Sequence, residues 1–270
     1  MKILLTGKPK SGKSTMLAQL LSEVESKHGF FSPEVRDGEV RIGFDLQDES
    51  GESAILSRTD KPTKYPVGRY FVDLKSFESF IEHLFIYDSG HLLFIDEVGQ
   101  MQLYSDRFMD LVSDYIGSPN DFIGTISQVH DHPFIQDLRG REDILLCMIT
   151  PENREELRSA LTEALRHRVF FNQLSRHTQK VALDLARNYL THNQLISLRK
   201  LFKNALPYVA TGKIQKQDGE FIVQGNTDSH NVRIRGTALT CDCDLFNGRG
   251  KFANHAAECS HIQSAKLISS

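Results

Sequence analysis

The sequence predicts an α/β fold with a mostly parallel sheet, followed by a helical connector and a small C-terminal module. Short apolar strands alternate with helices up to about residue 168, which is typical of a parallel sheet covered on both faces. Apolar residues then recur at helical spacing from about Leu174 to Leu206, and residues 211–240 change to polar strands with turn residues. We therefore expect three parts: residues 1–168, 169–208 and 209–270.

The first part opens with a strand over Lys2–Thr6, a glycine-rich loop and a helix over Lys13–Ser26, whose leucines recur on one face. The later elements are expected as strands within residues 30–75, a helix over Ser76–Phe85, a strand over His91–Ile95, a helix over Asp106–Ile116, strands over Phe122–Ser127 and Asp143–Ile149, and a helix over Pro151–Leu165 capped by Thr150.

Composition and charge limit the class of protein. Of 270 residues, 40% are hydrophobic and 25% are charged, which suits a soluble protein with a real core. Gly7 and Pro9 interrupt the first apolar stretch, and no segment has the roughly 20 apolar residues of a membrane span. We expect a cytoplasmic protein with no membrane association.

The net charge of −3 is unevenly distributed. Residues 166–203 hold eight Lys or Arg and one acid, Asp184, whereas residues 1–165 hold 17 basic and 28 acidic residues, a charge of −11. Such segregation favours modules with different partners. The alternative is a basic helical segment that packs on an acidic domain of the same chain.

The loop after the first strand has the pattern G-x-x-x-x-G-K-[ST]. It consists of Gly7, Lys8, Pro9, Lys10, Ser11, Gly12, Lys13 and Ser14, with Thr15 following. Backbone N–H groups of such a loop, together with the N-terminus of the next helix, surround phosphate oxygens. Lys13 would neutralise the β- and γ-phosphates and the Ser14 hydroxyl would bind Mg²⁺. The sequence therefore predicts a nucleoside-triphosphate site.

A pair of acidic residues supplies the second part of this site. The apolar run His91–Ile95 ends in Asp96 and Glu97, and an acid at that strand end lies at the carboxyl edge of the sheet beside the phosphate loop. We expect Asp96 to hold Mg²⁺ and Glu97 to orient or deprotonate the attacking water. A kinase acting on an acceptor hydroxyl would use the same acids, so this pair does not distinguish hydrolysis from transfer.

Several further segments resemble the nucleoside-triphosphatase family of the THEP type. They are "GFFSPEVRDGEVRIGFDL" (Gly29–Leu46), "VGRYFVDLKSFE", "FIDEVGQMQLYSDRF" (Phe94–Phe108) and "HPFIQDLRGREDILLCMITPENREEL" (His132–Leu157). The resemblance covers about residues 1–168. It implies a RecA-like P-loop fold that hydrolyses ATP, GTP and other nucleoside triphosphates with little base preference.

The resemblance also implies roles for single residues. Thr125, at the end of the Phe122–Ser127 strand, would sense the γ-phosphate beside the catalytic Lys13 and Glu97. Gln100 and Gln102 stand where the family usually has Lys and Glu. Arg36 is a candidate for stabilising transition-state charge, with a structural ion pair between strands as the alternative.

The other end of the chain has a different motif. Cys241-x-Cys243 and Cys259-x-His261 supply three thiolates and one imidazole, a full tetrahedral set for structural Zn²⁺. Clustered cysteines in a cytoplasmic protein favour a metal over disulfides. His255 is a rival ligand in the middle of the intervening loop. Cys147, in an apolar run, is expected to be a core residue of a strand.

The arrangement C-x-C-x(n)-C-x-H resembles the SWIM zinc finger, with a strand pair upstream (Phe221–Val223 and Val232–Ile234) and a helix after Cys259. The resemblance covers about residues 211–267 and makes the C-terminal module a small zinc-bound ββα unit. It implies binding to DNA, RNA or another protein. The basic connector offers the larger positive surface for phosphates.

The sequence thus predicts a Mg²⁺-dependent nucleoside-triphosphate hydrolase coupled to a zinc-bound module. Two alternatives remain open, namely a nucleotide or polynucleotide kinase and a nucleotide-gated adaptor with negligible turnover. Oligomerisation is also possible, because P-loop ATPases often complete their sites across subunits.

Overall fold

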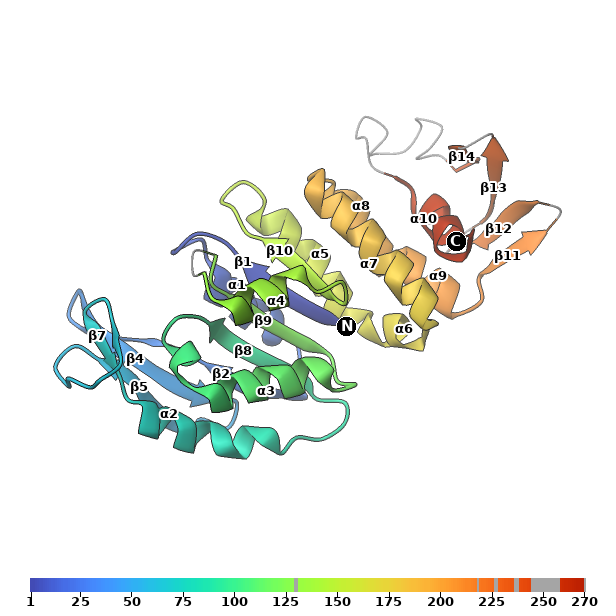
Figure 1. The fold of residues 1–270 in the computed structure, drawn as a ribbon. Coiled ribbons are helices and arrows are strands. Elements are labelled where there is room, and N and C mark those ends of the chain that lie inside the picture. The colour runs from blue at the N-terminus through green and yellow to red at the C-terminus, as the bar shows by residue number, and fades with distance from the viewer. Residues whose placement is uncertain (129–130, 218, 226–227, 236–237, 244–257, 270) are drawn as a thin grey trace. The chain divides into compact units, whose positions relative to one another are not determined.

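The computed structural model describes residues 1–128, 131–217, 219–225, 228–235, 238–243 and 258–269. The chain divides into two compact units, residues 1–151 and 152–270 (Figure 1). The predicted part boundaries at residues 168 and 208 both lie within the second unit. His255 lies outside the described residues.

A ten-stranded sheet forms the centre of the first unit. Its strands follow the order β10-β1-β9-β8-β2-β4-β5-β7-β6, with β3 paired to β4. Their bounds are β1 Lys2–Thr6, β2 Lys27–Phe31, β3 Glu34–Asp37, β4 Val40–Asp48, β5 Ser53–Arg58, β6 Pro66–Val67, β7 Tyr70–Val72, β8 Leu92–Val98, β9 Phe122–Ile126 and β10 Ile144–Met148.

The sheet has a parallel part and an antiparallel part. Strands β10, β1, β9, β8 and β2 pair in parallel, and β4 begins an antiparallel extension at β2. Because β9 lies between β1 and β8, the carboxyl ends of these three strands meet at one edge. This order places the phosphate loop, Thr125 and Asp96 on neighbouring strands.

Helices and 3₁₀ turns connect the strands of this unit. They are α1 Lys13–Leu21, α2 Leu74–Ile81, η1 Glu82–Phe85, η2 Gln102–Tyr104, α3 Asp106–Gly117 and α4 Pro133–Gly140. In Figure 1, α2 and α3 lie along one face of the sheet. Aromatic residues of both helices, including Phe77 and Phe108, pack against Phe30 of β2 in one large apolar core.

The second unit begins with helices. They are α5 Arg154–Arg166, α6 Arg168–Gln173, α7 Arg176–Thr191, α8 Leu195–Lys200, the π-helical turn η3 Leu201–Ala205 and α9 Leu206–Ala210. An antiparallel sheet follows, with β11 Ile214–Gln217, β12 Glu220–Gln224, β13 Ser229–Arg235 and β14 Ala238–Cys241 in sequential order, and then α10 Ser260–Ser269. The predicted strand pair is present, with Phe221 opposite Val232.

Two local expectations from the sequence were wrong. Thr150 does not cap a helix, because residues 151–153 form a turn and α5 starts at Arg154 with Asn153 at its N-cap. The helical segment, expected to about Leu206, continues to Ala210. Pro207 lies in the first turn of α9, directly after η3, where a missing N–H is tolerated.

Candidate functional site

The phosphate loop connects β1 to α1 with the backbone that its glycines permit. Gly12 is left-handed, with φ of 93°, and α1 has no side-chain cap at its N-terminus. A Cβ on Gly7 would lie 2.7 Å from both the Ile149 carbonyl oxygen and Ser11 Oγ, and its φ is 152°. The loop therefore presents uncapped helical N–H groups, which suit an anion.

The side chains of the loop fall into an exposed and a buried set. Lys8, Pro9 and Lys10 are exposed, as are Ser14 and Thr15 on the first turn of α1. Lys13 is buried, and its Nζ donates to the Gly7 carbonyl oxygen at 3.3 Å. The ammonium group thus lies within the loop itself.

Asp96 joins three elements at the carboxyl edge of the sheet. Its Oδ1 accepts hydrogen bonds from Ser14 Oγ of α1 at 3.0 Å and from Thr125 Oγ1 of β9 at 2.6 Å. The side chain is buried, and burial raises the pKa of its carboxyl although both hydroxyls and the nearby Lys13 oppose the rise. Three residues that are far apart in the sequence are therefore in direct contact.

Glu97 follows Asp96 in β8 and is half-buried. Burial raises the pKa of its carboxyl, and the charge of Asp96 raises it further, while the Lys13 ammonium lowers it. A carboxylate with a raised pKa is a stronger base than one in water. This is the property that activation of a water molecule requires.

Arg36 forms an ion pair, but within its own strand β3 and not between strands as the alternative had it. Its Nη2 lies 2.6 Å from Glu34 Oε2 within β3, and Glu34 also pairs with Arg41 of β4 at 2.6 Å. The Arg36 side chain is 52% exposed. A role for Arg36 in catalysis remains a prediction.

The site includes one residue that the sequence did not point to. Ser32, just after β2, donates from its Oγ to the Asp96 carbonyl oxygen at 2.5 Å, and Gln102 Nε2 lies 3.5 Å from the same Oγ. Only the pairing of β2 with β8 brings Ser32 to this position. No spacing in the sequence indicates the contact.

The donor atoms at this edge suit Mg²⁺. The Ser14 and Thr125 hydroxyls and the Asp96 carboxylate are hard oxygen ligands, which this ion prefers. Two further hydroxyls, Thr6 Oγ1 and Ser11 Oγ, are buried without a hydrogen-bond partner among the described residues. Such atoms fit a site that receives an additional polar group.

A second candidate site lies in the C-terminal unit. One ligand atom from each of Cys241, Cys243, Cys259 and His261 lies within 4.8 Å of all the others. The three thiols are buried, and Cys241 Sγ is 3.6 Å from His261 Nδ1. The two ligand pairs therefore meet in space as the sequence predicts, and the four donors suit tetrahedral Zn²⁺.

Without a cation this cluster is electrostatically unfavourable for thiolates. Hydrogen bonding with the Cys243 thiol is the main cause that raises the pKa of Cys241 to about 12, and both neighbouring thiols raise the pKa of Cys259. A bound divalent cation would instead lower the pKa of these thiols, because it stabilises the deprotonated sulfur. The chemistry of the donor set therefore fits a metal.

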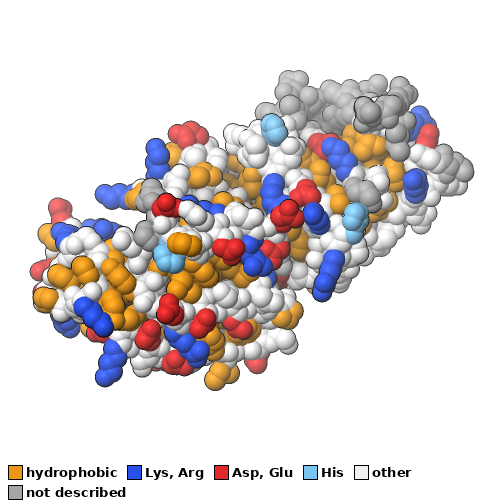
Figure 2. Space-filling model, viewed as in Figure 1, with side chains coloured by type: hydrophobic (Ala, Val, Ile, Leu, Met, Phe, Trp, Pro, Cys, Tyr) orange, Lys and Arg blue, Asp and Glu red, His pale blue; other side chains and the backbone are white. Residues whose placement is uncertain are grey.

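The basic helical segment is partly neutralised within its own unit. Arg199 and Lys203 lie 3.6 Å and 3.4 Å from the buried Glu163 carboxylate of α5, and Arg187 pairs with Asp184 at 2.7 Å. On the face in Figure 2, acidic and basic side chains are interspersed over these helices. Acids of the same unit therefore balance part of the positive charge of these helices.

Among the described residues, no helix has the length and hydropathy needed to cross a bilayer.

Comparison with known proteins gives a consistent result for the N-terminal part. A protein-family model described as NTPase matches residues 2–162. The Nucleoside-triphosphatase THEP1 of Thermotoga maritima is 36% identical over 170 residues, which are 62% of this chain and 96% of that protein. The human Cancer-related nucleoside-triphosphatase is 35% identical over an alignment of 173 residues that covers 57% of this chain and 91% of that protein.

Two solved structures are similar to the same part of the chain. The crystal structure of THEP1 from the hyperthermophile Aquifex aeolicus has a TM-score of 0.55 and 31% identity, and covers 60% of this chain and 96% of its own. The solution structure of a human cancer-related nucleoside triphosphatase has a TM-score of 0.54 and 32% identity. It covers 61% of this chain and 97% of its own. The predicted P-loop α/β fold with a mostly parallel sheet is confirmed.

Proposed function

The chain belongs to the NTPase family, and we propose that it is a Mg²⁺-dependent nucleoside-triphosphate phosphohydrolase acting at the carboxyl edge of the first unit's sheet. Its relatives are named nucleoside-triphosphatases. The observation that carries the proposal is the contact of Asp96 Oδ1 with both Ser14 and Thr125. It joins the phosphate loop, the acidic strand and the strand between them in one polar group.

The phosphate loop binds the triphosphate. Backbone N–H groups of the loop, other than Pro9, which has none, and Ser11, which donates to the Lys8 carbonyl oxygen, face the phosphate oxygens together with the N-terminus of α1. The Lys13 ammonium neutralises charge that develops on these oxygens. Ser14 and Asp96 hold Mg²⁺, which supplies electrostatic stabilisation to the phosphates when bound. Thr125 keeps the Asp96 carboxylate in position through its 2.6 Å hydrogen bond.

Glu97 is the general base. It deprotonates or orients the water that attacks the γ-phosphate, and its raised pKa suits this role. The proton moves to the Glu97 carboxylate, the bond between the γ-phosphorus and the bridging oxygen breaks, and the nucleoside diphosphate leaves. Its backbone neighbour Asp96 is fixed by Ser32, which limits movement of this strand end.

Phosphate release from ATP and GTP with Mg²⁺ tests this proposal. We expect Glu97→Gln to lower turnover by about 10² to 10⁴-fold, because it removes general-base catalysis. Glu25→Gln, at an exposed carboxylate of the same unit, should retain wild-type turnover. Equal release by wild type and Glu97→Gln would exclude Glu97 as the general base, and transfer to an added nucleoside or 5′-hydroxyl end would indicate a kinase.

We propose in addition that the Cys241, Cys243, Cys259 and His261 cluster holds structural Zn²⁺ in a SWIM-type module. The mutual proximity of the four donors and the strand pair and helix around them support this assignment. The four protein donors fill a tetrahedral shell, so the metal has no open position for substrate.

The zinc-bound unit is proposed to bind a partner, DNA or RNA or another protein, and to couple this binding to hydrolysis. Adding single- or double-stranded nucleic acid to the phosphate-release assay tests the first class of partner. Acceleration of the wild type but not of Glu97→Gln would support coupling to nucleic acid. Turnover that is indifferent to nucleic acid would contradict that coupling and leave a protein partner.

A further inference from the structure

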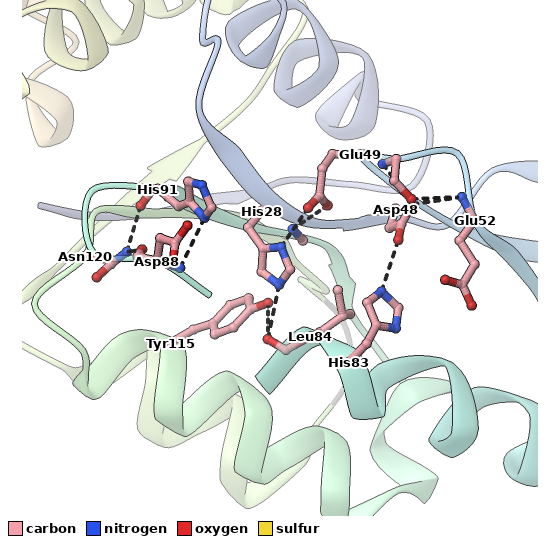
Figure 3. Close-up of polar contacts among 12 residues, drawn as sticks. His28, Asp48, Glu49, Glu52, His83, Leu84, Asp88, His91, Tyr115 and Asn120 are labelled. Atoms are coloured by element: carbon pink, nitrogen blue, oxygen red, sulfur yellow. Dashed lines mark hydrogen bonds and ion pairs between the residues drawn. The ribbon is translucent and has the colours of Figure 1, made fainter. Parts of the chain in front are cut away.

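A second group of metal-type side chains lies in the first unit, away from the phosphate loop. Asp48 ends β4, Glu52 lies in the turn before β5 and His83 lies in η1 (Figure 3). One ligand atom from each of these residues lies within 4.8 Å of the other two. We propose that the three side chains bind one divalent transition-metal ion of the Zn²⁺ class.

Asp48 is held in position for this role by its own turn. Its Oδ1 accepts three hydrogen bonds, from Ser50 N at 2.9 Å, Ser50 Oγ at 2.8 Å and Glu52 N at 2.9 Å. Its Oδ2 instead faces His83 Nε2 at 3.0 Å. One carboxylate oxygen is thus fixed by donors and orients the other toward the imidazole, as outer hydrogen bonds do for metal ligands.

The geometry of this pair is close to what a zinc ion requires. Two ligands of tetrahedral Zn²⁺, each about 2.0–2.1 Å from the metal, lie roughly 3.3 Å apart. The observed 3.0 Å between Asp48 Oδ2 and His83 Nε2 needs only a small increase. For Asp48 and His83, a metal ion can therefore replace the hydrogen bond with a small change of distance, and the exposed Glu52 carboxylate, within 4.8 Å of both ligand atoms, completes the protein ligands by moving closer.

The donor chemistry selects the class of ion. Two carboxylates balance a divalent charge, and an imidazole nitrogen favours Zn²⁺, Co²⁺ or Ni²⁺ over Mg²⁺ and Ca²⁺, which prefer oxygen ligands alone. Glu52 is exposed and the His83 side chain is 37% exposed. The solvent side of the cluster is therefore open for a water ligand to complete the shell.

This cluster is distinct from the proposed catalytic site. Asp48, the last residue of β4, pairs with Phe30 of β2, and the turn to Glu52 begins there. Within the turn, the Glu49 carboxylate lies 2.6 Å from His28 Nδ1 of β2. The cluster thus lies on β4, its turn and η1, with β2 between β4 and β8, and the hydrogen bonds of the Asp48 carboxylate go to its own turn and to His83 rather than to the Asp96 site. A metal here would fix the β4–β5 turn to η1 rather than act on phosphate.

Zinc stoichiometry of the full-length protein tests the assignment. In equilibrium dialysis without nucleotide, we expect the wild type to bind one equivalent more than the Cys241 cluster accounts for. With Co²⁺ as the probe, the additional equivalent is distinguished because it lacks thiolate charge-transfer absorption. His83→Ala should lose this equivalent, and Glu52→Gln should weaken its binding at least about tenfold.

His91→Ala is the matched control. The His91 ring stacks on His28, which contacts Glu49 of the same turn, but His91 is not part of the cluster. It should bind as the wild type does. The proposal is overturned if the wild type binds metal only with thiolate absorption, or if the additional equivalent survives both His83→Ala and Glu52→Gln. If His83→Ala does not fold, the exposed Glu52→Gln substitution decides alone. Phosphate release is expected to be unchanged in Glu52→Gln, so failure of this proposal is independent of the proposed hydrolysis.

Discussion

At the scale of single residues, the position of Asp96 depends on several distant parts of the chain. Its carboxylate is buried and hydrogen-bonded to hydroxyls of α1 and β9, and its carbonyl oxygen accepts from Ser32. A buried carboxylate is costly unless such donors surround it. The same hydrogen-bond donors that stabilise the buried Asp96 carboxylate also orient it toward the phosphate loop.

Substitution of Thr125 tests this arrangement. Thr125→Val keeps the shape of the side chain but removes the hydrogen bond to Asp96. The loss of a bond to a charged group, about 1.5–3 kcal/mol, should lower kcat by roughly 10- to 100-fold. Thr125→Ser keeps the hydroxyl and should retain most of the activity. Similar phosphate-release rates for Thr125→Val and wild type would show that the hydrogen bond does not contribute to catalysis.

His28 makes the stability of the first unit depend on pH. Its Nδ1 lies 2.6 Å from Glu49 Oε1 and its Nε2 lies 3.3 Å from the Leu84 carbonyl oxygen, so both ring nitrogens face acceptors (Figure 3). Burial lowers the pKa of His28, but the hydrogen bonds and the charge of Glu49 raise it above its ordinary value overall. The folded state therefore favours the imidazolium.

A raised folded-state pKa stabilises the protein fully below the unfolded pKa, near 6.5 for His, and this contribution is lost as pH rises through the folded value. The pKa of Glu49 is lowered, so its contribution is lost only at acidic pH, as pH falls through the lowered value. We expect His28→Gln to reduce the free energy of unfolding more at about pH 6 than at about pH 9. Urea denaturation at both pH values measures this, and an equal loss at both would contradict it.

Among the secondary-structure elements, β2 and β8 approach each other closely at Gly29. The φ of Gly29 is 149°, and a Cβ there would lie 1.8 Å from the Phe94 carbonyl oxygen. A side chain at this position would therefore separate the two strands that carry Ser32 and Asp96.

Gly29→Ala should destabilise the first unit by about 3 kcal/mol or more, because the backbone of β8 must move and the residue occupies a strained conformation. Gly117→Ala is a suitable control, since a Cβ at Gly117 would meet no atom of the described residues within 4 Å. Thermal unfolding of both variants makes the comparison. Equal melting temperatures for Gly29→Ala and wild type would contradict the close approach of β2 and β8.

At the scale of the whole molecule, the C-terminal cluster belongs to the same unit as the helices before it. Tyr189 of α7 donates to Glu258, Glu258 N donates to Ser197 Oγ, and Gln263 of α10 donates to the Ser197 carbonyl oxygen at 2.8 Å. The proposed zinc ligands Cys259 and His261 lie between these contacts. The proposed metal therefore stabilises the packing of α10 on the helices as well as the small sheet.

Removal of zinc should expose thiols in the second unit only. With metal bound, we expect none of the four cysteines to react rapidly with a thiol reagent. After a zinc-selective chelator, the three cluster thiols should react while Cys147, buried in β10, does not. Cys147→Ala should give the same result. Reactive cluster thiols before chelation would contradict zinc binding.

Much of the site was predictable because its parts are encoded locally. The phosphate loop has a fixed spacing, and Asp96 follows an apolar strand, so local sequence indicates both. The proposed zinc ligands are also locally encoded, as two pairs with one residue between their members, namely Cys241 with Cys243 and Cys259 with His261. Ser32 and the Asp48, Glu52 and His83 cluster were not predictable, because each depends on contacts between elements far apart in the chain.

The sequence by itself determined the phosphate loop, the acidic strand end, the cysteine and histidine pairs and the alternation of strands and helices. These features depend on residue type at short spacing, which a linear chain specifies directly. The tertiary structure alone decided that β9 lies between β1 and β8, that Asp96 contacts both Ser14 and Thr125, and that Arg36 pairs with Glu34. Strand order and side-chain partners depend on how the whole core packs, because many distant apolar residues compete for the same neighbours.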